Sequence, residues 1–141
     1  MRIFALLAVL AAVFASMAVA APQKGKPPST GPGCKPQVSV ILKGTIAETP
    51  GNTATLPFDL KVNVNHSNKH GRAYVAATQP VTVTLTTDTK IRRNDTSGLA
   101  ALQAMVAGDR VLAQARVCKA DLANGATPAL TAKQVVAHPT S

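Results

Sequence analysis

The sequence predicts an all-β protein with one short helix, folded as a small OB-like Greek-key barrel of five to six strands. Apolar residues occupy every second position from Leu56 to Val64, with Pro57 and polar residues between them, and every second position from Val111 to Val117. One short helical pattern, between residues 96 and 108, falls between the third and fourth strand regions. This is the element order of the OB-fold, a small barrel whose helix separates its third and fourth strands.

The first half of the chain supplies two long strands. Residues Val38–Ala47 alternate between apolar and polar side chains, and Gly44 lies where a barrel strand can bend. A turn cluster follows at Glu48–Asn52. The alternation over Leu56–Asn65 predicts that one face of this strand is buried and that the other faces water.

The middle of the chain predicts a hairpin and a further strand. Asn65–Gly71 is expected to form the hairpin tip, and Ala73–Thr78 the returning strand, with Tyr74 as its cross-strand aromatic residue. Pro80 breaks this strand, after which Val81–Arg92 is predicted as one continuous strand that ends in Thr89-x-Ile91.

A short helix is expected next. Thr96 or Ser97 can cap its first turn, and Gly108 is suited to the left-handed residue that ends it. Such a short helix must pack on the sheet, and we expect it to plug one end of the barrel. Its predicted apolar stripe consists of Leu99, Leu102 and Val106.

Two strands complete the predicted barrel. Val111–Cys118 places small residues inward, as a tapering barrel interior requires. A loop at Ala123–Pro128 leads to a last strand, Ala129–Ala137. The apolar phase of this strand changes near Lys133 and Gln134, which predicts a β-bulge.

Four short motifs carry a family resemblance. They are Gly44-Thr45-Ile46, Thr89-x-Ile91, Gly108-Asp109-x-Val111 and Leu130-x-Ala132. Together they resemble a secreted bacterial domain-of-unknown-function family in which T-x-I, G-D-x-V and a terminal A-x-x-I/V recur in a small OB-like barrel. The resemblance extends from about Val38 to Val136 and implies the fold and export. That family has no assigned activity, so no catalytic residue can be carried over.

The N-terminal region predicts an exported protein. Residues 1–20 have a basic start, an apolar run and an Ala18-Val19-Ala20 cleavage signal, so we interpret them as a signal peptide cut before Ala21. The alternative, a transmembrane anchor, would usually end in charged or aromatic residues. Residues 21–37 are predicted as a flexible basic lead rich in proline and glycine, residues 38–137 as the barrel domain and residues 138–141 as a tail. The expected location is the periplasm or the extracellular space.

The two cysteines fit this location. Cys34 and Cys118 are an even count in an exported chain, so we predict that they form a disulfide bond. The alternative of two free thiols is less compatible with an oxidising compartment.

The charge balance favours anionic partners. Without the leader, 14 of the 15 lysines and arginines remain against 6 acidic residues, a formal net charge of +8. Such a charge favours contact with anionic polymers or lipid headgroups, although net charge also serves solubility alone. The candidate anion-binding residues are Lys90, Arg92, Arg93, Arg110 and Arg116.

The same residues argue against several other functions. There is no G-x-S-x-G nucleophile motif, and we predict neither catalytic residues nor a cofactor. His66 and His70 have a spacing that suits a metal on a helix, but turn-forming neighbours and the lack of a nearby third ligand favour a solvated loop. Nucleic acid is not an expected partner because OB-fold sites stack bases on exposed aromatic residues, and Tyr74 is the only candidate platform.

The sequence therefore predicts an exported binding or structural module without catalytic activity, which binds polyanions weakly through a basic surface. The alternative is an accessory domain that pairs with a protein partner through an exposed sheet edge.

Overall fold

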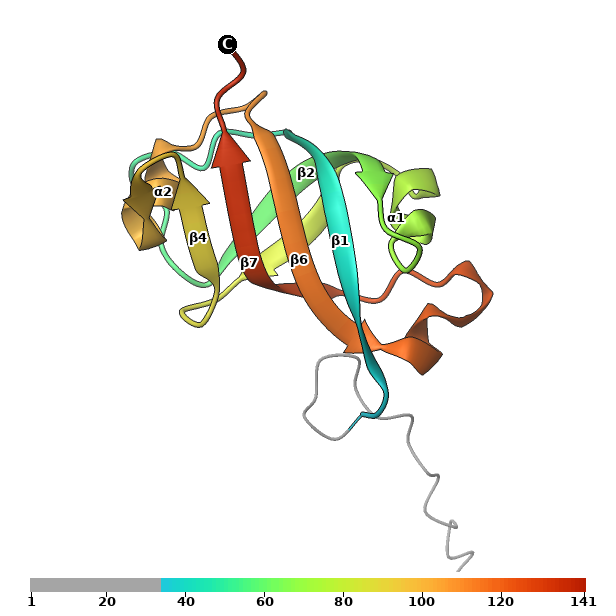
Figure 1. The fold of residues 1–141 in the computed structure, drawn as a ribbon. Helices are drawn as coiled ribbons and strands as arrows, with labels where there is room; N and C mark the ends of the chain where they lie inside the picture. The colour runs from blue at the N-terminus through green and yellow to red at the C-terminus, as the bar shows by residue number, and fades with distance from the viewer. Residues whose placement is uncertain (1–33) are drawn as a thin grey trace, which may run out of the picture.

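The computed structural model describes residues 34–141, which form one curved sheet and three short helices (Figure 1). The predicted leader and the predicted lead up to residue 33 lie outside the described residues. The elements, in chain order, are β1 (Gln37–Ile46), β2 (Phe58–Ser67), α1 (Arg72–Ala76), β3 (Val81–Leu85), β4 (Lys90–Arg93), β5 (Thr96–Ser97), α2 (Gly98–Ala104), β6 (Arg110–Cys118), the 3-10 helix η1 (Lys119–Gly125) and β7 (Leu130–His138).

Five strands close into the predicted barrel. The sheet has the order β3-β2-β1-β6-β7-β4-β5, and the start of β7 also pairs in parallel with β3, which joins the two sides of the barrel. The helix α2 lies between β3 and β6, the third and fourth strands of the barrel in chain order. The predicted all-β, OB-like barrel is confirmed.

Alternating side chains fill the barrel. The inward residues of β6 are small, and those of β2 and β3 are larger aliphatic residues, so the two sides of the core complement each other. This is the taper predicted from the alanines of β6. The inward strand residues that are buried include Val40, Leu42, Ile46, Leu60, Val62, Val64, Val83, Leu85, Val111, Ala113, Ala115, Val117, Leu130, Ala132, Val135 and Ala137.

The predicted bulge in the last strand is confirmed. Gln114 of β6 pairs with Gln134 of β7, whereas the next residue, Ala115, pairs with Ala132. Lys133 is therefore left without a partner in the ladder, and the strand changes phase at this point. The bulge allows Ala132 and Val135, three positions apart, both to face the core.

Gly44 allows β1 to lie against β2 at unusually close range. The register of the pair shifts beside Gly44, so that Lys43 is opposite His66 but Gly44 is opposite Val64, and Asn65 forms the bulge. A Cβ atom at Gly44 would lie 1.9 Å from the backbone oxygen of Asn63. At the position where the sequence predicts a bend, the structure therefore shows a close approach of two backbones that leaves no room for a side chain.

We expect Gly44→Ala to lower the free energy of unfolding by about 3 kcal/mol, since the backbone of two paired strands must move apart. Chemical denaturation measures this loss. Gly51→Ala is the control: Gly51 has φ +85°, but a Cβ atom added there would have no other atom within 4 Å, so only backbone strain of about 1 kcal/mol is added. Equal losses for the two variants would contradict the close-approach explanation.

The segment predicted as a returning strand is instead helical. Residues Arg72–Ala76 form α1, so the prediction of a strand at Ala73–Thr78 is wrong. The reason lies in two side chains. The Oε1 atom of Gln79 accepts a hydrogen bond from the backbone N–H of Val64 (2.8 Å), which removes the ladder position that a returning strand would use. Tyr74 is the buried residue of α1, and its hydroxyl donates to the backbone oxygen of Pro128 (2.6 Å).

Burial raises the pKa of Tyr74, the only tyrosine of the chain. Because the neutral phenol is favoured in the folded state, its contribution to stability is complete below the unfolded pKa of about 10 and declines as the pH rises further. We expect phenolate absorbance to stay absent above pH 10 until the barrel unfolds, and to titrate near pH 10 in denaturant. A folded protein whose tyrosine ionises near pH 10 would contradict this burial.

The strand predicted over Val81–Arg92 is interrupted. It divides into β3 and β4 around a turn in which the hydroxyl of Thr89 accepts from the N–H of Thr86 (2.9 Å) and donates to the carbonyl of Ala132 (2.8 Å). Thr89 thus fixes the turn to β7 and directs Ile91 into the core. Its side-chain hydrogen bonds compete with a continuous strand, which the alternating pattern alone could not reveal.

The helix α2 buries a different stripe from the predicted one. Leu102 is buried as expected, but Leu99 and Val106 are 40% and 45% exposed. The helix ends at Ala104, so Val106 lies beyond it, and Ala101 and Met105 are buried in the core with Leu102. The helix lies beside β4 (Figure 1). Of the two predicted capping residues, Thr96 and Ser97, Ser97 is the N-cap residue, but its side chain makes no capping hydrogen bond.

The predicted disulfide bond joins Cys34 to Cys118, with 5.7 Å between the two Cα atoms. It ties the chain before β1 to the end of β6, 84 residues later in sequence. Closing a loop of this length contributes about 4 kcal/mol in the chain-entropy model. The bond lies beside the pairing of Gln37 with Cys118, so it locks an existing strand register.

Candidate anion-binding face

Acidic residues are almost absent from the sheet. The chain has six acidic residues, and all lie within the part that the structure describes. Asp59 of β2 is the one that lies on a strand in this part of the chain, where it accepts a hydrogen bond from Thr84 (2.8 Å). The others lie in turns, loops or the 3-10 helix: Glu48, Asp88, Asp95, Asp109 and Asp121.

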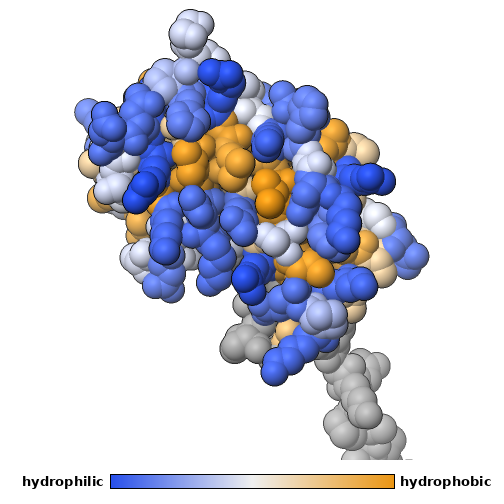
Figure 2. All heavy atoms as spheres, in the orientation of Figure 1, coloured by the Kyte–Doolittle hydropathy of each residue, from blue (hydrophilic) through white to orange (hydrophobic). Residues whose placement is uncertain are grey.

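Exposed cations cover the outer surface of the neighbouring strands β1, β6, β7 and β4. These strands carry no acidic residue over their full described lengths. We call this outward surface the basic face (Figure 2). Its exposed lysines and arginines are Lys43 of β1, Arg110 and Arg116 of β6, Lys133 of β7, and Lys90 and Arg92 of β4.

Strand register places these cations in rows around a few apolar residues. Lys43 pairs with Leu112, Leu112 with Val136, and Val136 with Arg92, so an apolar pair lies between two cations in one row. Directly paired side chains on one face lie about 5 Å apart. In the adjacent row Ile41, Gln114, Gln134 and Lys90 follow one another across the same strands.

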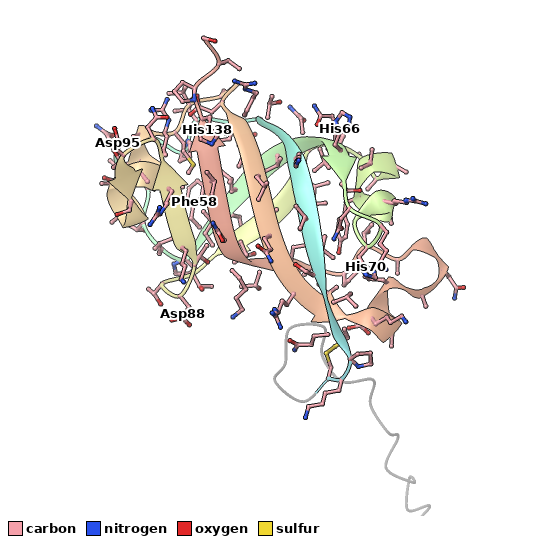
Figure 3. All side chains as sticks on the ribbon, in the orientation of Figure 1. Phe58, His66, His70, Asp88, Asp95 and His138 are labelled. Atoms are coloured by element: carbon pink, nitrogen blue, oxygen red, sulfur yellow. A yellow bond between two sulfur atoms is a disulfide. The ribbon has the colours of Figure 1, made fainter. Side chains whose placement is uncertain are left out.

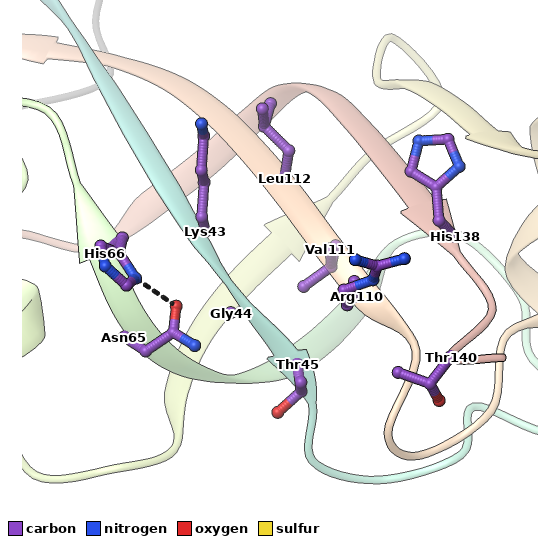
Figure 4. Close-up of a pocket in the computed structure, with 10 residues that line it drawn as sticks. All are labelled: Lys43, Gly44, Thr45, Asn65, His66, Arg110, Val111, Leu112, His138 and Thr140. Carbon is purple, nitrogen blue, oxygen red and sulfur yellow. Dashed lines mark hydrogen bonds between the residues drawn. The ribbon is translucent and has the colours of Figure 1, made fainter.

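A groove lies at one end of this face. It is open to solvent, has a volume of about 630 Å³, and lies beside the bulge at Asn65 (Figure 4). The ring Nδ1 of His66 lies 3.1 Å from the Oδ1 atom of Asn65. Its lining contains two cations, two histidines and no carboxylate: Lys43, Gly44, Thr45, Asn65, His66, Arg110, Val111, Leu112, His138 and Thr140.

The structure distributes the five predicted anion-binding residues over several places. Arg110 lines the groove, and Lys90 and Arg92 lie two strands away on the same face. Arg116 is six residues further along β6, about 20 Å from Arg110 at the usual rise of a strand. Arg93 binds a carboxylate of the protein itself. The predicted residues therefore share a face, with the exception of Arg93, but do not form a single pocket.

The groove also contains ionisable residues outside the predicted anion-binding set. Lys43 is in an outward position of β1, and the register with β2 and β6 brings it beside His66 and Arg110. His138 falls in the predicted tail, but β7 extends through it and pairs it with Arg110. The alternation of β1 could have indicated the direction of Lys43, whereas its neighbours depend on register.

The two histidines with metal-like spacing are separated. His66 lines the groove, while His70 lines a second hollow with Lys69, Arg72 and Lys119, and Figure 3 shows the two rings well apart. Within residues 34–141, no three histidine, cysteine or carboxylate side chains come together as a metal-binding cluster.

Two serine hydroxyls on strands have structural partners. The Oγ atom of Ser39 accepts from the side-chain amide of Gln114 (2.9 Å), and that of Ser67 donates to the backbone oxygen of Asn68 (3.0 Å).

Asp109 and Arg93 form an ion pair in which the carboxylate is buried and the guanidinium is partly exposed. Asp109 is 1% exposed and accepts hydrogen bonds from Arg93 Nε (2.7 Å), Arg93 Nη2 (3.3 Å) and the backbone N–H of Val106 (3.1 Å). Burial alone would raise the pKa of Asp109, but the hydrogen bonds from Arg93 and Val106 outweigh it and hold that pKa below its usual value. The Asp109 carboxylate thus compensates the charge of Arg93 and fixes the turn before β6 to β4.

We expect Asp109→Asn to lower the free energy of unfolding by about 2 kcal/mol at neutral pH, since the amide cannot replace the charged hydrogen bonds to Arg93. The folded pKa lies below the unfolded value of about 4, so this stabilisation is present above pH 4 and is lost as the pH falls through the folded pKa. Denaturation measured over acidic pH should therefore show the two proteins converging. A difference that stays constant down to the lowest pH would contradict the assignment.

Neither α-helix of the described chain is long and apolar enough to cross a membrane. No known family, curated protein or solved structure matches the chain.

Proposed function

We propose that the protein is an exported, non-catalytic binding module whose basic face binds anionic polymers or lipid headgroups. The observation that carries this proposal is the segregation of charge: six exposed cations share a continuous outer surface on four strands that contain no carboxylate. Cations that served solubility alone would not need to gather on strands that carry no acidic residue. Membership of the secreted family that the sequence resembles is also part of this proposal.

The rigidity of the sheet favours such binding. The cations of the basic face extend from paired strands, and β1 and β6 are paired along nine residue positions. A rigid array needs no ordering of its backbone when it meets an anionic surface, so less conformational entropy is lost. Each Lys or Arg held near an anionic lipid surface contributes about 1 kcal/mol at physiological ionic strength, an attraction that falls off within the Debye length.

Export is supported by the disulfide bond together with the predicted leader. Cys34 and Cys118 are bonded, and such bonds persist in oxidising compartments. An exported protein with a basic face meets the acidic polymers and lipids of a cell envelope.

Pairing with a protein through a free sheet edge has less support. Closure of the barrel pairs β3 with both β2 and β7. The part of β1 beyond the end of β2 is covered by Asn68, which accepts from the N–H of Ile41 (3.2 Å) and donates to the carbonyl of Ser39 (2.7 Å). These edges of the barrel are thus occupied, and the sheet ends instead at β5, which is only two residues long.

Heparin chromatography tests the proposal. We expect retention at low ionic strength, and we expect the double variant Lys43→Glu/Arg110→Glu to elute at about half the salt concentration of the original protein, because two cations of the face become anions. The matched control is Lys69→Glu/Arg72→Glu, which changes the net charge equally at the hollow beside α1. Equal shifts for both variants, or no retention at all, would refute a specific role of the basic face.

A further inference from the structure

We propose that the basic face docks onto membranes that contain anionic phospholipid, with the lipid phosphates at the cations and the interfacial part of the lipids against a strip of aliphatic side chains. This inference rests on the proposed function and names the occupant of the same surface. The observation behind it is that aliphatic side chains lie in the centre of the basic face. A purely electrostatic site would not need them.

The aliphatic side chains are continuous across three strands. Leu112 of β6 pairs directly with Val136 of β7, and Ile41 of β1 is the diagonal neighbour of Leu112, since it pairs with Gln114 two residues further on. All three face outward and are partly exposed. We call these three residues the apolar strip, and Figure 2 shows apolar atoms running across this face between hydrophilic residues.

The cations flank the apolar strip closely. Lys43 and Arg92 occupy the two ends of the row that contains Leu112 and Val136, and Lys90 ends the row that contains Ile41. Long basic side chains lay their methylene stems on apolar surface and hold their charges further out. A face of this kind matches the bilayer interface, where anionic phosphates lie just above apolar lipid segments.

The groove gives one end of the face a place for a phosphate group. Lys43 and Arg110 line it together with the hydroxyl of Thr45 and the rings of His66 and His138 (Figure 4). These are donors to phosphate oxygens, and Leu112 lies in the same lining. A headgroup phosphate in the groove would therefore have the apolar strip directly beside it.

The other occupants fit less well. Single-stranded nucleic acid is bound by stacking on exposed aromatic residues, and the outward positions of β1, β4, β6 and β7 hold no aromatic residue. An acidic sugar polymer would contact the cations but would make no use of the apolar strip. A second copy of the chain would bring its own cations against those of the first, and like charges in contact oppose association. Anionic lipid satisfies both the charge and the apolar strip.

Co-sedimentation with vesicles tests the inference. The purified protein is mixed with vesicles of phosphatidylglycerol and phosphatidylcholine, or with phosphatidylcholine alone, at low and at physiological ionic strength. We expect binding to the mixed vesicles only, with a part that persists at physiological ionic strength because the apolar strip contributes. Equal binding to both vesicle types, or to neither, would overturn the inference.

Two sets of variants separate this inference from the general proposal. Leu112→Thr/Val136→Thr places a β-branched residue, which suits a strand, at both positions, and we expect it to weaken vesicle binding about ten-fold while heparin retention stays unchanged. Lys43→Glu/Arg110→Glu should weaken both. If the threonine variant binds vesicles like the original protein, the membrane inference fails and the proposed function stands; if Lys43→Glu/Arg110→Glu leaves heparin retention unchanged, the proposed function itself fails.

Thermal unfolding of each variant checks that the barrel remains folded, and outward positions on paired strands make this the expected result. Size-exclusion chromatography adds the last test. A dimer that the threonine variant dissociates would assign the apolar strip to self-association and would overturn the membrane inference.

Discussion

The close contact of β1 with β2 at Gly44 is the constraint on which the rest of the structure depends. Because Gly44 has no side chain, the backbone of Asn63 can approach it, and the register of the two strands shifts here through the bulge at Asn65 of β2. β1 pairs with β2 along one edge and with β6 along nearly all of the other. It therefore joins β2 and β3 to β6 and β7, and the pairing of β3 with β7 closes the barrel.

The same bulge borders the groove. Asn65 and His66 line the groove with Lys43 and Thr45, and β6 and β7 supply Arg110 and His138 on the other side. The register shift at Gly44 therefore also determines which residues of β2 line the basic groove. Gly44 allows the close contact of β1 with β2 and also lines the groove. It therefore links the fold to the proposed binding surface.

The strands could be predicted from the sequence where the alternation of neighbouring residues determines them. The prediction failed where hydrogen bonds between distant segments determine the secondary structure. Alternation in β2 and β6 follows from burial of one face, and the bulge of β7 is visible as a change of phase at Lys133. The helix α1 depends on Gln79 occupying the N–H of Val64, and the break before β4 depends on Thr89 bonding to Ala132. Neither contact leaves a periodic signal in the chain.

The pairing register of the strands limits the prediction of the candidate site in the same way. The outward direction of Arg110, Arg116, Lys90 and Arg92 follows from alternation, but alternation is silent about which outward residues become neighbours. The charge of Arg93 is compensated because the turn at Gly108 aims Asp109 toward β4, whereas Arg92, one residue earlier, stays exposed. Two adjacent arginines thus have opposite roles, one holding the barrel together and one available to a ligand. The basic face consists of cations that extend from strands without carboxylates, and this distinguishes it from an ordinary charged surface.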